Sequence, residues 1–325
     1  MEYQNIEIMN KKSFVLIFFF IFSEINFLFS KELDFKLVPY TGFECGVFDE
    51  AYYYDDFSEY SDKMCSLLEW KQNYSFILGL EVDIDFKNFN FFTDVSTKLP
   101  LKCGKMYDSD YWENGLKFNY SINELYLNNF FCFNTGFSYS FDISSFSIAP
   151  VLQGSYSYIS LSAKNGYGWY GGSGHSSDGQ VHSWNSPFAH YYPDGKYHLA
   201  GVDYENQTFY FMLGVDFSKV FFKKWCLGFG LYVAPFTYIY VKDHHLGKSN
   251  NFYSEDYIYN YFENYKFLIR NNIFFTKHIS LVTLLEGNIQ LLVKGENYEN
   301  GKLNSQKGGE SLQAIKLKAG IGFSF

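Results

Sequence analysis

Two aspartates separated by one residue, in the segment GKMYDSDYW, are the first side chains whose type and spacing could do chemistry. Asp108 and Asp110 follow a stretch in which apolar side chains occupy the odd positions from Phe89 to Leu101. Residues two apart on an extended strand face the same side. If no bulge intervenes, both carboxylates therefore point to the polar side and could hold a water or a substrate. A solvated loop or an incidental calcium ligand pair is the alternative interpretation.

A second pair lies in the segment YVKDHHLG, where Asp243 and His245 are again two residues apart. A carboxylate beside an imidazole fixes its tautomer and raises its basicity, as in a general base. The alternation from Trp225 to Val233 would turn His245 toward the apolar side, so the strand must slip by one residue. Pro235 is the expected bulge, because proline is confined to the edges and bulges of sheets.

The remaining histidines and cysteines do not form a metal or nucleophile motif. Neighbours on a strand point to opposite faces, so His244 and His245 are not expected to share a metal ion. Five cysteines are scattered without a CxxC, and an odd number cannot pair completely. HExxH, GxSxG, P-loop and dinucleotide-binding motifs are absent from the sequence. We therefore expect no metal and no cofactor.

Acidic side chains are concentrated around the first expected loop. They are Glu44, Asp49, Glu50, Asp55, Asp56 and Glu59. An ordinary solvated loop explains such a segment, and the alternative is a pocket mouth whose carboxylates attract cationic peptides. The net charge of −9 argues against nucleic acid as a partner.

Alternation with period two is the pattern that must position these residues. From Leu67 to Phe86 the even positions are mostly apolar and the odd positions mostly polar, and the pattern recurs at 279–293 and 315–325. A strand of about twenty residues with one apolar and one polar face is about twice the usual length in globular proteins. The 38 Phe and 30 Tyr suit a wall that meets lipid and both membrane interfaces, although an AT-rich genome would also enrich them.

Long and short polar segments alternate along the chain. The long ones lie near 55–62, 104–118, 165–196, 244–256 and 297–310, and the short ones near 87–88, 140–146, 217–224 and 275–278. This order predicts an all-β fold, a ten-stranded antiparallel transmembrane β-barrel with five long outer loops and short periplasmic turns. Both chain ends lie on the side of the short turns. The sheet must close, because lipid cannot satisfy an open edge.

The N-terminus indicates the compartment. Lys11 and Lys12 precede the apolar run SFVLIFFFIF and a small residue at Ser30, which is the pattern of a secretory signal peptide. We expect residues 1–30 to be removed and residues 31–325 to form a single barrel domain in the outer membrane. No later segment offers 18 uninterrupted apolar residues, so no transmembrane helix is expected.

Taken together, these segments resemble the omptins, the outer-membrane endopeptidases of Gram-negative bacteria. CGVFDEAYYY resembles the segment that carries the glutamate of the family's specificity pocket, here Glu50, and SLLEWK resembles S-x-L-D-W-K of the second strand. GKMYDSDYW resembles the M-x-D-x-D-W block with two catalytic aspartates, here Asp108 and Asp110. KDHH resembles the catalytic D-x-H, here Asp243 and His245. NYKF, LLEGN and AGIGFSF follow the family's spacing, so the resemblance covers essentially the whole mature chain.

The resemblance implies peptide hydrolysis at the outer lip of the barrel. His245, oriented by Asp243, would act as general base on a water that Asp108 also holds. Asp110 would keep the constellation polarised and help with the tetrahedral intermediate. No covalent intermediate is implied.

The chain departs from the family at three points. The second acid of the pocket for basic residues is replaced by Val241. Glu50 is left alone in this role, so we expect a relaxed or changed specificity. The segment 113–119 is shorter than the corresponding loop. The outer-wall positions that hold lipid A in the family are Tyr158 and Gln207 here, so dependence on lipopolysaccharide is not expected.

The leading hypothesis is a monomeric, surface-exposed endopeptidase in outer-membrane lipid that cuts peptides near basic residues. The alternative is a catalytically inactive barrel that serves as an adhesin or binding surface. Four retained residues of catalytic type favour the first, whereas Val241 favours the second or a changed substrate. A diffusion porin is less favoured, because side chains can largely fill the lumen of ten strands.

Overall fold

The described part of the chain is an antiparallel sheet that closes on itself. In the computed structural model the described residues are 33–54, 59, 60, 62–193, 201–246 and 252–325. The strands are β1 (Leu33–Tyr53), β2 (Met64–Phe86), β3 (Phe89–Lys98), β4 (Lys102–Tyr111), β5 (Lys117–Tyr139), β6 (Phe141–Ile143), β7 (Phe146–Tyr170), β8 (His190–Tyr192), β9 (Val202–Phe221), β10 (Trp225–His245), β11 (Tyr253–Asn260), β12 (Asn264–Phe274), β13 (Ile279–Glu299) and β14 (Lys302–Ser324). The expected signal peptide lies outside the described residues. Within them, no helix is long and apolar enough to cross a membrane.

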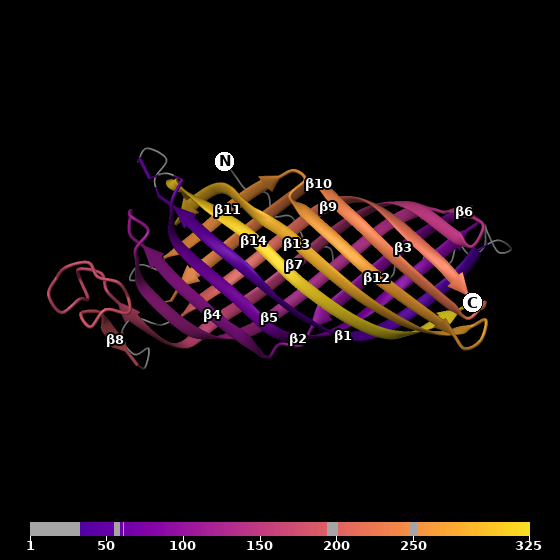
Figure 1. Cartoon of the computed structure of the whole chain (residues 1–325), viewed down its shortest axis with the longest axis horizontal. Helices are drawn as coiled ribbons and strands as arrows, with labels where there is room; N and C mark the ends of the chain where they lie inside the picture. Colours follow the sequence, from indigo (N-terminus) through magenta and orange to yellow (C-terminus); the bar gives the residue numbers. More distant parts are fainter. Residues whose placement is uncertain (1–32, 55–58, 61, 194–200, 247–251) are drawn as a thin grey trace, which may run out of the picture.

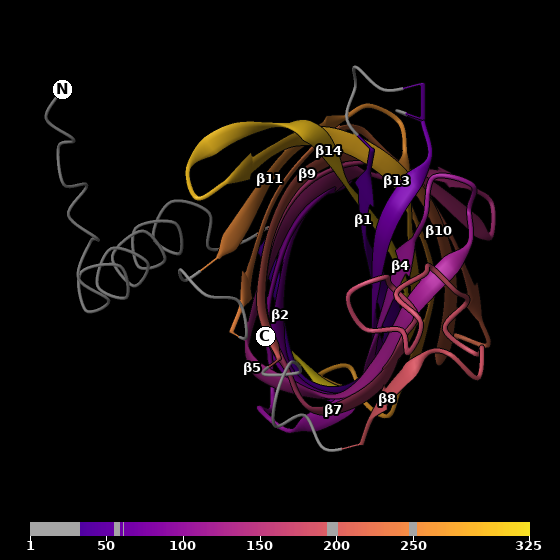
Figure 2. The same ribbon diagram turned by 90° about the vertical axis from the view of Figure 1, so that its left-hand side faces the viewer.

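Pairing between the first and last strands closes the ring. β1 pairs with β2 on one side and with β14 on the other, and β5 pairs with β7. β3 and β4 succeed one another between β2 and β5, as β11 and β12 do between β10 and β13. Counting each of these interrupted strands once, and leaving the short β6 and β8 aside, ten strands surround one lumen (Figures 1 and 2).

An apolar belt covers the outer wall. The outward side chains that form it are large, apolar and at least 40% exposed, and include Phe43, Leu80, Phe91, Phe137, Leu213, Leu231, Ile269 and Ile315. Alternate residues on the same strands face the lumen, where many are polar, as the period-two pattern predicts. Such exposure is unfavourable in water and suits a wall that faces lipid.

Charged side chains bound this belt on the side of the longer connections. One cross-strand row on the outside of β2, β4, β5 and β7 consists of Lys71, Lys105, Glu124 and Lys164. Another, on β9, β10 and β11, consists of Glu205, Lys242 and Glu255. Charges are strongly disfavoured in hydrocarbon, so the strand ends at and beyond these rows lie outside the lipid-facing wall.

β2 reverses the face on which its apolar side chains lie. A register shift near its middle leaves Leu68 and Trp70 facing the lumen, whereas Leu78 and Leu80 face outward. The single apolar face predicted for 67–86 is therefore wrong. A bulge adds one residue, so the side chains after it switch between the lumen face and the outer face. The alternation of apolar and polar residues along the sequence continues through it, so the sequence pattern does not indicate the bulge.

β10 slips where the sequence predicts that it should. Its register with β9 shifts between Val233 and Phe236, which places Pro235 in the irregularity. Beyond this point the odd positions are buried, and they include Asp243. The predicted bulge at Pro235 is confirmed, and it is what turns Asp243 and His245 inward.

The turns follow the expected order, but two outer connections are shorter than predicted. Segment 297–310 is strand apart from the tight turn at Asn300 and Gly301, whose φ angles are 48° and 75°. Segment 104–118 is strand except for 112–116. Both predictions of a long loop are wrong, because strand ends that project beyond lipid meet water on their outer face and need no apolar alternation. The first described residue of β1 pairs beside the turn at 87–88, so the described chain ends lie on the short-turn side as expected.

Two cavities occupy the lumen, one toward each end. The outer cavity, on the side of the longer connections, has a volume of about 380 Å³, and the inner cavity, on the side of the short turns, has about 440 Å³. Inward apolar side chains from strand segments between the two cavities form a core. Its members include Phe48, Leu68, Trp70, Leu125, Leu127, Leu161, Tyr204, Ile239 and Ile258. The rings of Trp70 and Tyr204 pack with centroids 4.6 Å apart, so this core separates the cavities.

Candidate active site

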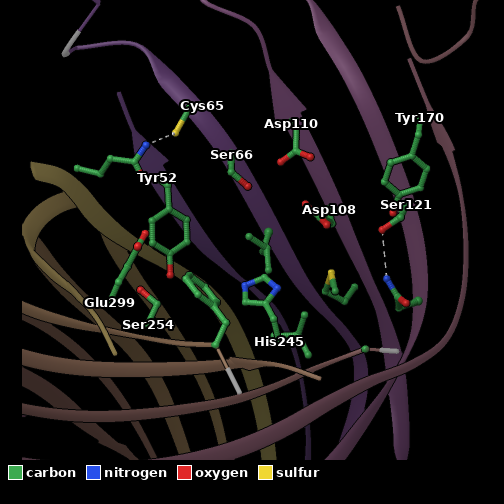
Figure 3. A pocket seen from close by; sticks show the side chains of 17 residues that line it. Tyr52, Cys65, Ser66, Asp108, Asp110, Ser121, Tyr170, His245, Ser254 and Glu299 are labelled. Carbon is green, nitrogen blue, oxygen red and sulfur yellow. Dashed lines mark hydrogen bonds between the residues drawn. The ribbon is translucent and has the colours of Figure 1, made fainter. Parts of the chain in front are cut away.

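The outer cavity gathers side chains from both pairs that the sequence singles out. Asp108 and Asp110 come from β4 and His245 from the end of β10, strands that β5, β7 and β9 separate in the ring. Figure 3 shows the imidazole of His245 and the two carboxylates facing the same space. Both pairs therefore face the lumen, as the sequence predicts. For Asp108 and Asp110 the condition of an uninterrupted strand is not met, because the strand breaks after Lys98 and the register shifts between Lys102 and Gly104, and the two irregularities together leave the inward parity unchanged.

Asp243 holds the imidazole from beneath. The distance from Nε2 of His245 to Oδ2 of Asp243 is 2.7 Å, and the Asp243 side chain is fully buried. The backbone N–H of Ser254 on β11 donates to Oδ1 of Asp243 at 3.2 Å. The ring of Phe252 packs edge-on against the imidazole, with centroids 5.4 Å apart. Because Nε2 lies against this carboxylate, we assign Nδ1 as the nitrogen that accepts a proton.

The aspartates of β4 are fixed by both neighbouring strands. Asp108 stands opposite Leu68 of β2 and Ser121 of β5, and Asp110 stands in the next inward row. Nδ2 of Asn119 donates to Oδ2 of Asp110 at 3.0 Å. Two carboxylates on one rigid face, opposite an oriented imidazole, are the groups needed to hold and deprotonate a water.

Glu50, which the sequence suggests as a substrate-binding residue, does not line the outer cavity. It is fully buried below the cavity floor. Its Oε1 accepts a hydrogen bond from the hydroxyl of Tyr52 at 2.9 Å, and its Oε2 accepts one from Nε1 of Trp70 at 3.2 Å. Tyr52 does line the cavity (Figure 3), and its hydroxyl contacts Glu50, so Glu50 is joined to the cavity only through Tyr52 in this arrangement.

Four carboxylates form a buried acid cluster at this level of the barrel. Its members are Glu50, Asp243, Asp256 and Glu310. Burial raises the pKa of Glu50 well above its usual range, and the charges of Asp243, Asp256 and Glu310 raise it further. Burial also raises the pKa of Asp256 to about 7. Within the described residues no lysine or arginine forms an ion pair with any of the four, so the cluster either holds protons or accepts a cation.

Asp256 is a candidate that the sequence reasoning missed. It lies directly opposite Val241 in the pairing of β10 with β11, beside the position where the family's second acid is expected. Nδ2 of Asn297 donates to Oδ1 of Asp256 at 2.7 Å. The carboxylate also occupies the space over Gly308, where an added Cβ would lie 2.1 Å from Oδ1. No spacing along the chain indicates this residue, because its relation to Val241 exists only through strand register.

Other residues of the first acidic segment are dispersed. Glu44 belongs to the lumen and not to a rim, because it faces inward and its Oε1 lies 2.8 Å from Nζ of Lys98. That part of the prediction is wrong, since Glu44 lies deep along β1 rather than at its end. Asp49 accepts a hydrogen bond from Ser311. Asp55 and Asp56 lie outside the described residues.

The remaining predicted positions lie on the outer wall. Tyr158 and Gln207 are cross-strand partners on β7 and β9. His244 follows the opposite parity from His245 on β10. In the described part of the chain, no three His, Cys, Asp or Glu side chains are grouped so as to hold a metal ion.

The chain matches no protein-family model and no curated protein sequence. Among proteins of known structure it is similar to the outer membrane protease OmpT from Escherichia coli, with 15% identity and a TM-score of 0.73 over 91% of this chain and 97% of that one. It also aligns with the translocator domain of the autotransporter NalP from Neisseria meningitidis over 97% of this chain and 96% of that one, at 8% identity and a TM-score of 0.37, a likeness too low to use. The likeness to OmpT shows that the chain has an all-β, outer-membrane barrel fold, and the chemistry has to be argued from the site.

Proposed function

We propose that this protein is an outer-membrane endopeptidase that hydrolyses peptide bonds near basic residues at the outer end of its barrel. The observation that carries the proposal is the contact between His245 and Asp243, which faces Asp108 and Asp110 across the outer cavity. The similarity of the fold to that of OmpT supports the same class of reaction.

In the proposed reaction a water in the outer cavity attacks the peptide carbonyl. His245 takes the proton of this water, while Asp243 stabilises the imidazolium that results. Asp108 orients the water, and Asp110 keeps the site polarised. His245 then returns the proton to the leaving amine. Proton transfer by a positioned group contributes about 10²–10⁴-fold to the rate.

The buried acid cluster accounts for the proposed preference for basic residues. An arginine or lysine side chain that displaced the ring of Tyr52 would meet Glu50 and Asp256, which have no cation of their own. Burial keeps these carboxyl groups protonated when the site is empty. A bound cation would let them lose their protons and ionise. Asp256 thus takes the part of the acid that is missing at Val241.

The proposal includes the surroundings of the barrel. The apolar belt meets outer-membrane lipid, and the partner is a peptide rather than a nucleic acid. Neutral side chains at Tyr158 and Gln207 give no cation for a lipid phosphate, so we propose that the activity does not require lipopolysaccharide. The proposal also takes the protein to be a monomer that uses no cofactor.

A panel of fluorogenic peptides tests the function. Outer membranes carrying the wild type, Asp108→Ala or His245→Ala are compared, with His244→Ala as a matched control on the other face of the same strand. We expect peptides with Arg or Lys to be cleaved by the wild type and the control, and cleavage to be lost in the other two variants. If the wild type cleaves no basic peptide, with or without lipopolysaccharide, the proposal fails and a binding barrel becomes the better account.

A further inference from the structure

Tyr170 is a side chain of the outer cavity to which the proposed reaction assigns no part. It lies at the end of β7, in one cross-strand row with Asn119 of β5 and Asp110 of β4. Figure 3 shows its phenol pointing into the cavity, with the hydroxyl toward Ser121 and beside Asp108. The hydroxyl therefore reaches the row of inward residues that contains Asp108.

Three neighbouring features hold the phenol in this direction. The ring of Tyr192 packs edge-on against it with centroids 5.5 Å apart, and the ring of His175 lies 5.4 Å away. Nδ1 of His175 and the hydroxyl of Tyr192 are 3.2 Å apart, so the two bracing rings also contact each other. The preceding inward residue of β7 is Gly168, where a Cβ would lie 2.8 Å from that of Ser121. The space over Gly168 is therefore left for the phenol.

Peptide hydrolysis by water needs a group that donates a hydrogen bond to the developing oxyanion. Asp108 and Asp110 are acceptors when ionised, and His245 is occupied with the proton of the water. The hydroxyl of Tyr52 is already engaged by Glu50. Burial raises the pKa of Tyr170, and the charge of Asp108 raises it further, so its hydroxyl stays protonated and able to donate at neutral pH.

We infer that Tyr170 is a catalytic residue whose hydroxyl donates a hydrogen bond to the carbonyl oxygen of the scissile peptide. The inference rests on the proposed endopeptidase function. As the water oxygen bonds to the carbonyl carbon, its proton passes to His245 and the π electron pair moves to the carbonyl oxygen, which Tyr170 stabilises without giving up its proton. The C=O bond then re-forms, the C–N bond breaks, and His245 protonates the amine. The products are one carboxylic acid and one amine.

The substitution Tyr170→Phe tests this role, because it removes the hydroxyl and keeps the ring. We expect kcat to fall by about 10²-fold, as for other single oxyanion donors, with KM changed less than about threefold. Tyr191→Phe is the matched control: it removes a tyrosine hydroxyl one residue away from the bracing Tyr192, on a side chain that is 46% exposed and does not line the cavity. This control should keep the kcat of the wild type.

A thioamide at the scissile bond distinguishes hydrogen bonding from a merely structural role. Sulfur accepts hydrogen bonds more weakly than oxygen. Replacing the amide by the thioamide should therefore slow the wild type by a larger factor than it slows the Tyr170→Phe variant. Equal thioamide effects in the two proteins, or an unchanged kcat in Tyr170→Phe, would overturn the inference while leaving the endopeptidase intact. Absence of cleavage by the wild type would instead count against the proposed function itself.

Discussion

Several carboxylates in the inner half of the lumen pair with lysine or arginine, whereas among the described residues none of the buried acid cluster does. Arg270, which lines the inner cavity, binds Glu81 through both guanidinium nitrogens at 2.8 and 2.7 Å, and three lysines approach other acids along the lumen. The lysine pairs are Lys98–Glu44 at 2.8 Å, Lys316–Glu286 at 3.2 Å and Lys318–Asp94 at 3.7 Å. At the level of the acid cluster the same kind of lumen contains four acids and, among the described residues, no Lys or Arg paired with them.

This difference distinguishes lumen side chains that satisfy one another from lumen acids that are available to a ligand. An ion pair that crosses the lumen compensates buried charge and links strands that lie far apart in the sequence. Unpaired buried acids disfavour folding at neutral pH, which a protein tolerates where the charge meets a ligand. The acid cluster lies directly beneath the imidazole of His245, which is where a bound cation would be useful.

The largest expected effect comes from giving the acid cluster a cation. Val241→Lys would place an ammonium opposite Asp256 and so reproduce the pairing of the inner half. Because like charges in one site repel by several kcal/mol, we expect kcat/KM for peptides with Arg or Lys to fall at least about 10²-fold. The measurement is steady-state cleavage of the peptide panel, with Val241→Leu as the control for bulk. Unchanged cleavage of basic peptides by the lysine variant would mean that this cluster does not select the substrate.

Removing a cation from the inner half should act on stability instead. Lys98→Met leaves Glu44 buried with only the more distant Lys316, whose Nζ is 3.8 Å from Oε2. We expect a loss of about 3 kcal/mol in unfolding free energy, since removing one partner of a buried pair leaves an uncompensated charge. Denaturant unfolding in detergent, followed by circular dichroism, measures it.

Two comparisons make the Lys98 result specific. Adding Glu44→Gln to Lys98→Met should restore most of the lost stability, and the cleavage rate of each folded variant should stay near that of the wild type. A loss of cleavage without a loss of stability would mean that the Lys98–Glu44 pair serves cleavage rather than stability.

The pH dependence of stability probes one acid of the cluster. The folded pKa of Asp256, about 7, exceeds the value of 3.8 expected for the unfolded chain, so the folded state binds more protons between these values. Stability from this group is therefore full below pH 3.8 and is lost as the pH rises through 7. Between pH 5 and pH 7 the loss is about 2 kcal/mol. Asp256→Asn should remove that slope in unfolding experiments; an identical slope in the variant would assign the pH dependence to other groups.

The smallest expected effect concerns a hydrogen bond at the border between the halves. The hydroxyl of Tyr204, fully buried, donates to Oε1 of Glu310 at 2.8 Å. Tyr204→Phe keeps the ring that packs on Trp70 and removes this donor. We expect a loss of about 1 kcal/mol in unfolding free energy, the usual net value of such a bond. A loss above about 3 kcal/mol would indicate that Glu310 is ionised rather than protonated in the wild type.

Much of the fold could be predicted from the sequence, because strand geometry is local. Side chains alternate with period two, so apolar positions on one parity and polar positions on the other indicate long strands with two different faces. The same rule places Asp108 on the same face as Asp110. Proline is a local signal as well, which is why the slip at Pro235 could be predicted. The slip within β2 carries no such signal, and there the prediction of one apolar face fails.

By itself, then, the sequence determined which residues share a face: Asp108 with Asp110, and Asp243 with His245. Only the tertiary structure decided which faces meet, since strand register and ring closure join residues through backbone hydrogen bonds that no spacing along the chain records. This is why Asp256 opposite Val241, the burial of Glu50 beneath Tyr52 and the reach of Tyr170 toward Asp108 emerge only when the ring closes.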